Sequence, residues 1–317
     1  MSNKTVTVFG GSGFVGSQII RELAAKGFMI KVATRVPERA YDLKPCGNVG
    51  QIIPIACNYN NDESIESALR DSDYVVNCIG ILFERGKSST FKKIHVDIPQ
   101  KIAQACAENG VDRFVHISAL GCDTGTSKYA KTKLAGEDAI KNAFPAATIL
   151  RPSVIFGPKD NFFNMFASLS LYMPFLPLIG GGKTKFQPVF VGNVADAVLY
   201  ALQEKKGESK GKTYHLGGPD IVDFKEIYQK LFKYTGRTKP LVNLPFAFAK
   251  FEALFLSMLP KPLLTSDQVE SLKTDVIISQ GALTFENMGI HPKSMDLILP
   301  LYLKMYRSGG RFSQKTA

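Results

Sequence analysis

A glycine-rich turn near the start of the chain constrains its fold more than any other feature. Residues 5–9 form an apolar, β-branched run, and residues 17–23 follow with a helical pattern. Side chains at Gly10, Gly13 and Gly16 would block the tight turn, the approach of phosphates and helix–strand packing. The N–H groups and dipole of the helix favour a pyrophosphate there. A plain glycine-rich βα turn is the alternative. We predict dinucleotide binding, with contacts from Gly10, Ser12, Gly13, Phe14, Val15 and Gly16.

Strand and helix patterns alternate as far as about residue 155. Strands are expected within residues 27–35, 49–56, 73–80, 113–118 and 147–151, and helices over 62–69, 97–109 and 128–143. Near-continuous apolar strands that alternate with helices predict an α/β fold, a Rossmann-type doubly wound parallel sheet covered on both faces. We assign residues 1–157 to an NADP(H)-binding Rossmann domain and residues 158–317 to a smaller, mainly helical C-terminal lobe. Within that lobe, residues 187–218 are expected to return to the sheet domain.

The end of the second strand bears on which nicotinamide cofactor is bound. An acidic residue there would accept a hydrogen bond from the ribose 2′-hydroxyl of NAD, but this chain has Thr34 and Arg35. A guanidinium binds a 2′-phosphate bidentately, so we predict NADP(H) rather than NAD(H). The alternative is that Arg35 is a solvated charge. The ends of later strands supply four further candidate cofactor contacts, which are Ile79, Gly80, Pro152 and Ser153.

Tyr129 and Lys133 are the candidate chemical groups. They lie four residues apart, on one face of an expected helix. A tyrosine with an ordinary pKa near 10 is a poor acid–base catalyst at neutral pH, and a nearby ammonium would lower that pKa. Lys133 would also bond the nicotinamide ribose. Ser118, at the end of the preceding strand, would polarise a substrate carbonyl or hold the phenol. All three are candidate catalytic and cofactor-binding residues.

Composition limits the other classes of function. The five cysteines are scattered without a CxxC pair, and the four histidines are not closely spaced, so no metal site is expected. The net charge is +11, and the second half carries most of it: residues 151–317 hold 21 basic and 13 acidic residues, against 18 and 15 in residues 1–150. A basic surface suits anionic lipid, nucleic acid or an acidic protein, or is simply solvated. No nucleic-acid-binding signature is present, so we expect no nucleic-acid partner.

An apolar stretch occupies residues 241–264 near the C-terminus. Pro245, Lys250 and Glu252 interrupt it, so it is not expected to span a bilayer. It predicts either an amphipathic helix that lies on a membrane or a membrane protein, or a helix packed on the protein's own core.

The motifs above resemble the extended and atypical short-chain dehydrogenases/reductases. Residues 143–164, with the run Leu150-Arg151-Pro152-Ser153, and residues 187–197 are more specific. They resemble the dehydrogenase-like accessory subunit of mitochondrial respiratory complex I and its bacterial relatives, over residues 4–235. Two departures are Cys57-Asn58, where relatives often have an Asp near the adenine, and His95-Val96, where many have an Asn before the helix.

The motifs and the resemblance leave two functions of different classes open. The first is an NADP(H)-containing accessory or assembly subunit of a membrane quinone-linked system, either complex I or ubiquinone biosynthesis. Such a protein is expected in the cytoplasm, peripheral on the inner face of the inner membrane, or on the matrix side in a mitochondrion. The second is an NADPH-dependent reductase or epimerase on a hydrophobic carbonyl substrate, with Tyr129 as general acid/base.

Overall fold

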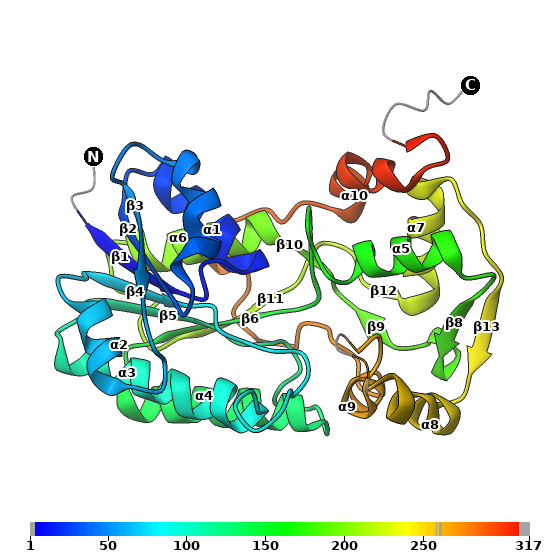
Figure 1. The fold of residues 1–317 in the computed structure, drawn as a ribbon, viewed down its shortest axis with the longest axis horizontal. Helices are drawn as coiled ribbons and strands as arrows, with labels where there is room; N and C mark the ends of the chain where they lie inside the picture. The colour runs from blue at the N-terminus through cyan, green and yellow to red at the C-terminus, as the bar shows by residue number, and fades with distance from the viewer. Residues whose placement is uncertain (1–3, 258, 260–261, 311–317) are drawn as a thin grey trace.

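A seven-stranded parallel sheet forms the middle layer of the lobe on the left of Figure 1. The structure, a computed structural model, describes residues 4–257, 259 and 262–310. In order across the sheet, the strands are β11 (Thr213–Leu216), β6 (Thr148–Pro152), β5 (Arg113–Ile117), β4 (Tyr74–Asn77), β1 (Thr5–Phe9), β2 (Met29–Thr34) and β3 (Ile52–Ala56). The predicted doubly wound parallel sheet is therefore confirmed.

Helices cover both faces of this sheet, because its strands are apolar on both sides. Val6 and Val8 of β1 pack into one core, whereas Phe9 packs into the other. The helices on the first face are α1 (Phe14–Ala25), the 3-10 segment η1 (Pro37–Cys46) and α6 (Val191–Gln203). Those on the second face are α2 (Asp62–Leu69), the short π-helical segment η2 (Lys93–Asp97), α3 (Ile98–Glu108) and α4 (Lys128–Ala143).

The strand order reverses between β1 and β4, and this reversal defines the place for a ligand. From β1 the chain builds outward through β2 and β3, and then crosses back to β4 and continues through β5 and β6. In open sheets of this kind, ligands bind beyond the carboxyl ends of the strands at that switch point. The glycine turn follows β1 directly, so it lies at this edge.

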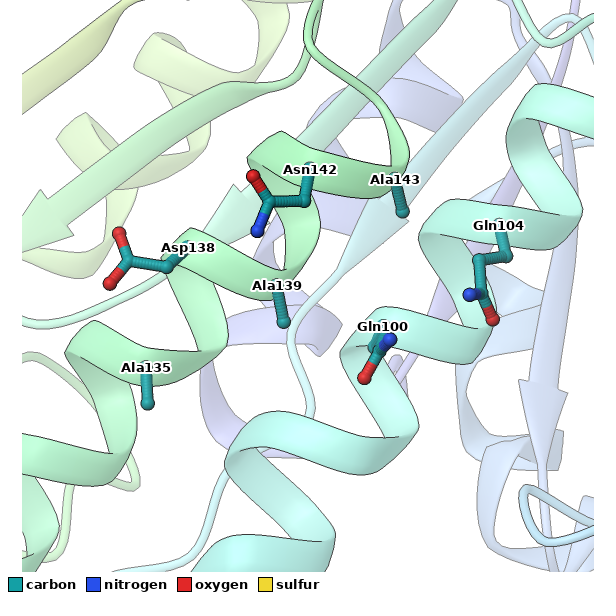
Figure 2. Close-up of a pocket in the computed structure, with 7 residues that line it drawn as sticks. All are labelled: Gln100, Gln104, Ala135, Asp138, Ala139, Asn142 and Ala143. Atoms are coloured by element: carbon teal, nitrogen blue, oxygen red, sulfur yellow. The ribbon is translucent and has the colours of Figure 1, made fainter.

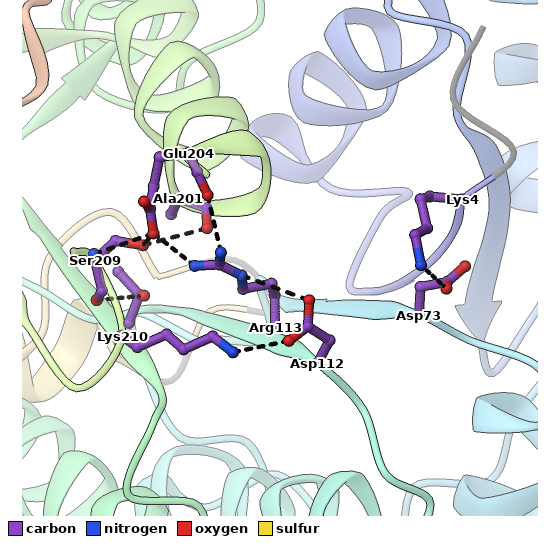
Figure 3. A network of polar contacts seen from close by, with 9 residues as sticks. Lys4, Asp73, Asp112, Arg113, Ala201, Glu204, Ser209 and Lys210 are labelled. Carbon is purple, nitrogen blue, oxygen red and sulfur yellow. Dashed lines mark hydrogen bonds and ion pairs between the residues drawn. The ribbon is translucent and has the colours of Figure 1, made fainter. Parts of the chain in front are cut away.

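A polar network fastens the opposite, amino-terminal edge of the sheet (Figure 3). Arg113, at the start of β5, donates to the carboxylate of Glu204 at 2.6 Å and to its carbonyl at 2.8 Å. The Ser209 hydroxyl donates to the same carboxylate at 2.9 Å. Burial alone would raise the pKa of Glu204, but these hydrogen bonds lower it to about 2. The network therefore joins the start of β5 to the end of α6, at the edge of the sheet opposite the glycine turn.

The C-terminal lobe has its own aromatic core. It holds the helices α5 (Phe163–Tyr172), α7 (Phe224–Thr235), α8 (Phe246–Leu256), α9 (Ser266–Ser271) and α10 (Met295–Leu303), with the 3-10 segments η3 (Gly180–Gly182) and η5 (Lys304–Tyr306). A further 3-10 segment, η4 (Glu286–Met288), packs against the sheet domain. Short strands link the lobe in three pairs, β7 (Ile155–Phe156) with β10 (Val189–Phe190), β9 (Lys185–Phe186) with β12 (Val222–Asp223), and β8 (Leu176–Ile179) with β13 (Leu241–Leu244).

Two segments differ from the sequence-based expectation. The third strand begins at Ile52 rather than Val49, because Gly50 adopts a positive φ of 78° and Val49 lies fully exposed in the turn. The apolar stretch at 241–264 begins as strand β13 and continues as α8, instead of forming one helix. Among the described residues, none of the helices combines the length and apolar character that crossing a bilayer requires.

Candidate functional site

The glycine turn forms a close-packed cradle at the start of α1. Gly10 has a φ of +75°, and a Cβ added there would lie 2.9 Å from the backbone carbon of Cys78. A Cβ on Gly16 would lie 2.4 Å from the carbonyl oxygen of Gly10. Gly13 is exposed at the N-cap of α1, and the first turn of the helix has no acidic residue. The geometry fits an anion held by backbone N–H groups at Phe14, Val15 and Gly16, with nothing of like charge beside it.

The contact between Gly10 and residue 78 brings the end of β4 to the turn. The N–H of Ile79 lies 3.0 Å from where a Gly10 Cβ would be, and it donates to the side chain of Asn77 at 3.0 Å. Gly80 follows, and a Cβ there would meet nothing within 4 Å. Ile79 and Gly80 therefore line the edge beside the cradle, where a dinucleotide would pass.

Arg35 directly follows β2, next to the cradle. Its side chain is exposed, and its guanidinium lies 5.9 Å from the centre of the Tyr59 ring. Tyr59 donates to the carbonyl of Ala33 at 2.8 Å, which fixes that ring. Cys57 is buried, and burial raises the pKa of its thiol, while Asn58 is exposed. Arg35 is thus the only charged residue among these four, and its side chain is exposed.

Helix α4 carries both Tyr129 and Lys133 toward the sheet. Lys133 is buried, and its ammonium donates to the carbonyl of Ile117, at the end of β5, at 2.9 Å. Burial lowers the pKa of Lys133 to about 8. The Tyr129 ring packs edge-on against Phe91 and His95, with centroids 5.9 and 5.3 Å away. Burial raises the pKa of Tyr129, so the expected lowering by a nearby ammonium is wrong for this structure.

Ser118 makes its contact inside the protein. Its hydroxyl donates to Glu137 at 2.5 Å, and Glu137 is completely buried. Arg151 donates two hydrogen bonds to the same carboxylate, at 2.9 and 2.8 Å. Burial alone would raise the pKa of Glu137, but the bonds from Arg151 and Ser118 lower it. The carboxylate is therefore ionised and accepts the hydrogen bond that the Ser118 hydroxyl donates.

His95 takes the place expected for an Asn in many relatives. Its Nδ1 lies 3.1 Å from the hydroxyl of Thr132, and its Nε2 lies 3.1 Å from the carbonyl of Ile81. Burial and the nearby Lys133 lower its pKa to about 3, so the ring is neutral. The ring also stacks on Phe91 at 5.2 Å. His95, held by these contacts, therefore packs against the Tyr129 ring and limits its movement.

Pro152 and Ser153 end the strand β6 at the same edge of the sheet. Both are buried, and the carbonyl of Pro152 accepts from the N–H of Leu120 at 2.9 Å. The Ser153 hydroxyl donates to the carbonyl of Val276 at 3.1 Å. Ser153 therefore joins the sheet to a distant segment of the C-terminal lobe.

Two groups that build the site were not predicted from the sequence. Glu137 lies four residues after Lys133 on the same helix, and that spacing could have indicated a shared buried face. Asp267 of α9 accepts from the N–H groups of Lys128 and Tyr129, at 2.7 and 3.0 Å. It caps the first turn of α4 from well over a hundred residues away, and no local pattern marks it.

Neither of two surface grooves coincides with the candidate site. The first lies between α3 and α4, lined by alanine and amide side chains and by the carboxylate of Asp138 (Figure 2). The second lies beside α7, between residues 219–233 and Asp296. Within the part of the chain that the structure describes, no group of three or more acidic, His or Cys side chains could hold a metal ion.

Comparison with known proteins agrees with the parallel sheet and the glycine turn described above. The model of the NAD dependent epimerase/dehydratase family matches residues 6–217, from within β1 to the residue after β11. The chain belongs to that family.

Two curated relatives are similar over nearly the whole chain. The mitochondrial NADH dehydrogenase [ubiquinone] 1 alpha subcomplex subunit 9 of Arabidopsis thaliana is 34% identical, over 98% of this chain and 80% of its own length. The mitochondrial NADH-ubiquinone oxidoreductase 40 kDa subunit of Neurospora crassa is 30% identical, over 98% of this chain and 82% of its own length. The resemblance inferred from the motifs is confirmed.

A solved structure shares the fold. The NADPH-dependent quinone oxidoreductase of Escherichia coli, solved with NADPH, superposes with a TM-score of 0.72. It is 18% identical, and the match covers 91% of this chain and 96% of that one. At that identity the likeness shows the architecture alone.

Proposed function

We propose that this protein is an NADP(H)-binding accessory or assembly subunit of a membrane-bound, quinone-linked system, with complex I as the first candidate partner. One pair of observations carries the proposal. An intact dinucleotide cradle stands in a chain whose curated relatives, similar over 98% of its length, are subunits of NADH–ubiquinone oxidoreductases. Ubiquinone biosynthesis is the second candidate system. The proposed place is the inner face of the inner membrane, as a peripheral protein.

The residues present fit a bound NADP(H). The backbone at Gly10, Gly13 and Gly16 would hold the pyrophosphate, and Arg35 would hold the 2′-phosphate. Lys133 and Tyr129 would face the nicotinamide ribose from α4. When bound, the nicotinamide supplies or accepts a hydride.

The contacts of the candidate catalytic groups favour retention of the nucleotide over turnover. The Ser118 hydroxyl is bonded to a buried carboxylate, and the pKa of Tyr129 is raised rather than lowered. A general acid/base works best with a pKa near the operating pH. These groups therefore support binding better than proton transfer.

Two measurements test the proposal. Mass spectrometry of nucleotide released by denaturing freshly purified protein should find NADP(H), and an empty protein that also rejects both pyridine nucleotides in calorimetry would refute it. Affinity purification from detergent-solubilised membranes should recover complex I or quinone-biosynthesis proteins. Recovery only from the soluble fraction, without these partners, would contradict the accessory role.

A second function is supported by one observation. Tyr129 and Lys133 are both present on α4, at the spacing of an acid–base pair, and Lys133 reaches the end of β5. In an NADPH-dependent reductase or epimerase, Tyr129 would exchange a proton with the substrate oxygen, supported by Lys133. The substitution Tyr129→Phe distinguishes the two functions. A loss of turnover or of phenotype with unchanged nucleotide content would favour catalysis.

A further inference from the structure

The first turn of helix α4 is completed by a carboxylate from the C-terminal lobe. Ser127, which precedes the helix, accepts on its hydroxyl from the N–H of Ala130 at 3.1 Å. The N–H groups of Lys128 and Tyr129 donate instead to Asp267 of α9, one to each carboxylate oxygen, at 2.7 and 3.0 Å. The N–H groups of the first three helical residues are therefore all paired, and two of these three bonds come from the other lobe.

Helix α9 holds Asp267 in place independently of α4. Figure 1 shows α9 between α8 and the near end of α4. Thr265 and Gln268 form a capping box around the start of α9, with bonds of 2.9 and 3.2 Å. Val269 is completely buried, in the cluster that includes Ala253 of α8. Because α9 is fixed in the C-terminal lobe on both sides of Asp267, the lobe decides where this carboxylate lies.

The same segment of the lobe also reaches the end of strand β6. Beyond α9, the carbonyl of Val276 accepts from the Ser153 hydroxyl at 3.1 Å. Residues 265–276, called the α9 segment below, therefore contact two of the residues predicted to bind the nucleotide, Tyr129 through its N–H and Ser153 through its hydroxyl. These two residues belong to different elements of the sheet domain, so the place of both is tied to the α9 segment.

The Tyr129 side chain depends on this support more than its neighbour Lys133 does. The Lys133 ammonium has a direct bond to the sheet, at the carbonyl of Ile117. The Tyr129 hydroxyl has no hydrogen-bond partner among the residues that the structure describes, and its ring is held only by packing, against Phe91 and His95. The position of the phenol therefore depends on that packing and on the backbone of the first turn of α4.

We infer that Asp267 is a positioning residue for the nicotinamide end of the nucleotide site, and that it acts through the turn of α4 that carries Tyr129. The inference rests on the proposed function, because it requires a nucleotide whose nicotinamide ribose lies beside Tyr129. Asp267 holds the turn from the lobe, and the Tyr129 hydroxyl would bond the nucleotide on the other side. Nucleotide binding and the docking of α9 on α4 therefore strengthen each other by the same factor. Occupancy of the site is in this way transmitted to the C-terminal lobe.

Titration calorimetry with two ligands tests the positioning role. NADPH reaches the nicotinamide end, whereas adenosine 2′,5′-bisphosphate carries only the adenosine end and its phosphates. Asp267→Ala should weaken NADPH binding about fivefold and leave binding of the adenosine fragment within about twofold. Asp267→Asn keeps the shape of the side chain but accepts from only one of the two N–H groups, so it should show a smaller loss for NADPH. An unchanged NADPH affinity in Asp267→Ala, or an equal loss for both ligands, overturns the positioning role.

Asp223→Ala is the matched control. Asp223 accepts from the N–H of Glu226 at 2.8 Å and so caps α7, a helix of the same lobe that carries none of the candidate site residues. Its removal should destabilise the lobe to a similar extent and leave the affinities for both ligands unchanged. An NADPH affinity that falls equally in Asp223→Ala and Asp267→Ala would show a general loosening of the lobe, and would also overturn the positioning role.

Hydrogen exchange tests the link between the site and the lobe without relying on affinity. In the nucleotide-free protein, Asp267→Ala should speed exchange at the N–H groups of Lys128 and Tyr129 at least about fivefold. In the unaltered protein, NADPH should slow exchange in α9, and the adenosine fragment should not. Equal exchange in α9 with and without NADPH overturns the link. If the protein binds no pyridine nucleotide, the proposed function and the positioning role fail together, while exchange at α4 still decides whether Asp267 holds its first turn.

Discussion

The substitution Gly16→Ala tests the physical basis of the nucleotide cradle most directly. An alanine Cβ would lie 2.4 Å from the Gly10 carbonyl oxygen and 2.7 Å from the Cα of Gly11. Ordinary carbon–oxygen contacts are nearly an ångström longer, so α1 must move away from the turn. Overpacking of this kind costs about 1–3 kcal/mol, against a gain of about 1 kcal/mol in helix propensity. We expect a net loss of about 1 kcal/mol, and a melting temperature lower by about 2–4 °C.

Gly13→Ala is the matched comparison within the same turn. Its Cβ would lie 3.3 Å from the Gly10 carbonyl, and the residue has an ordinary φ of −80°. The fold should tolerate this methyl group, but the methyl group would occupy the approach of the pyrophosphate. We therefore expect a melting temperature close to that of the unaltered protein and an NADP(H) affinity reduced at least about tenfold, which is about 1.4 kcal/mol.

Differential scanning calorimetry of the nucleotide-stripped proteins and titration calorimetry with NADPH separate the two effects. Gly16→Ala should lose both stability and affinity, whereas Gly13→Ala should lose affinity alone. A Gly16→Ala protein that melts no lower than the original and binds NADPH equally well would refute the close-packed cradle. Unchanged affinity in Gly13→Ala would show that no phosphate passes over this turn.

Three further changes are expected to have distinct effects. Arg35→Ala should weaken NADPH binding about 10- to 100-fold and leave NADH binding within about twofold, by titration calorimetry; an equal loss for both would exclude a 2′-phosphate contact. Glu204, whose pKa is lowered from 4.5 to about 2, should contribute about 2 kcal/mol of stability that is present above pH 4.5 and lost as the pH falls toward 2. Urea denaturation across that range should show the loss, and Arg113→Ala should reduce its pH dependence; the same dependence in both proteins would contradict the pairing. Glu137→Ala should cost about 3–5 kcal/mol, because it removes the buried carboxylate that accepts two hydrogen bonds from Arg151 and leaves that guanidinium with the partly exposed Asp123 alone; a urea midpoint near that of the original protein would contradict this.

The parts of the fold that depend on local sequence were predictable. A strand, three spaced glycines and a helix follow one another within about twenty residues, and each of them restricts the fold. Alternating apolar strands and helices likewise fix the doubly wound sheet. The pair of Tyr129 and Lys133 was visible because helical periodicity places positions four apart on one face.

The contacts of those residues were not predictable, because they come from other segments. The environment of Tyr129 is set by Phe91 and His95 from another helix, and their packing against it produces the burial that raises its pKa. The capping of α4 by Asp267 joins positions 138 residues apart. Helix α8 was open to two interpretations in sequence, because apolar residues on a short helix suit a core and a membrane equally. In the structure Ala249 and Ala253 are the buried residues of α8, whereas Phe248, Phe251, Leu254 and Phe255 are exposed.

Retaining a nucleotide and turning over a substrate require different arrangements of the same polar groups. Retention needs backbone N–H groups around the phosphates and side chains that the protein itself holds in place. Here Ser118 donates to Glu137, and Lys133 donates to the carbonyl of Ile117. Turnover would need the Ser118 hydroxyl to donate to a substrate carbonyl instead. A nucleotide held at a hundred times its dissociation constant stabilises the folded state by about 2.7 kcal/mol, without any reaction. A subunit whose bound nucleotide fastens the sheet domain would be more stable with that nucleotide than without it. That dependence is useful in an assembly component even if no hydride is transferred.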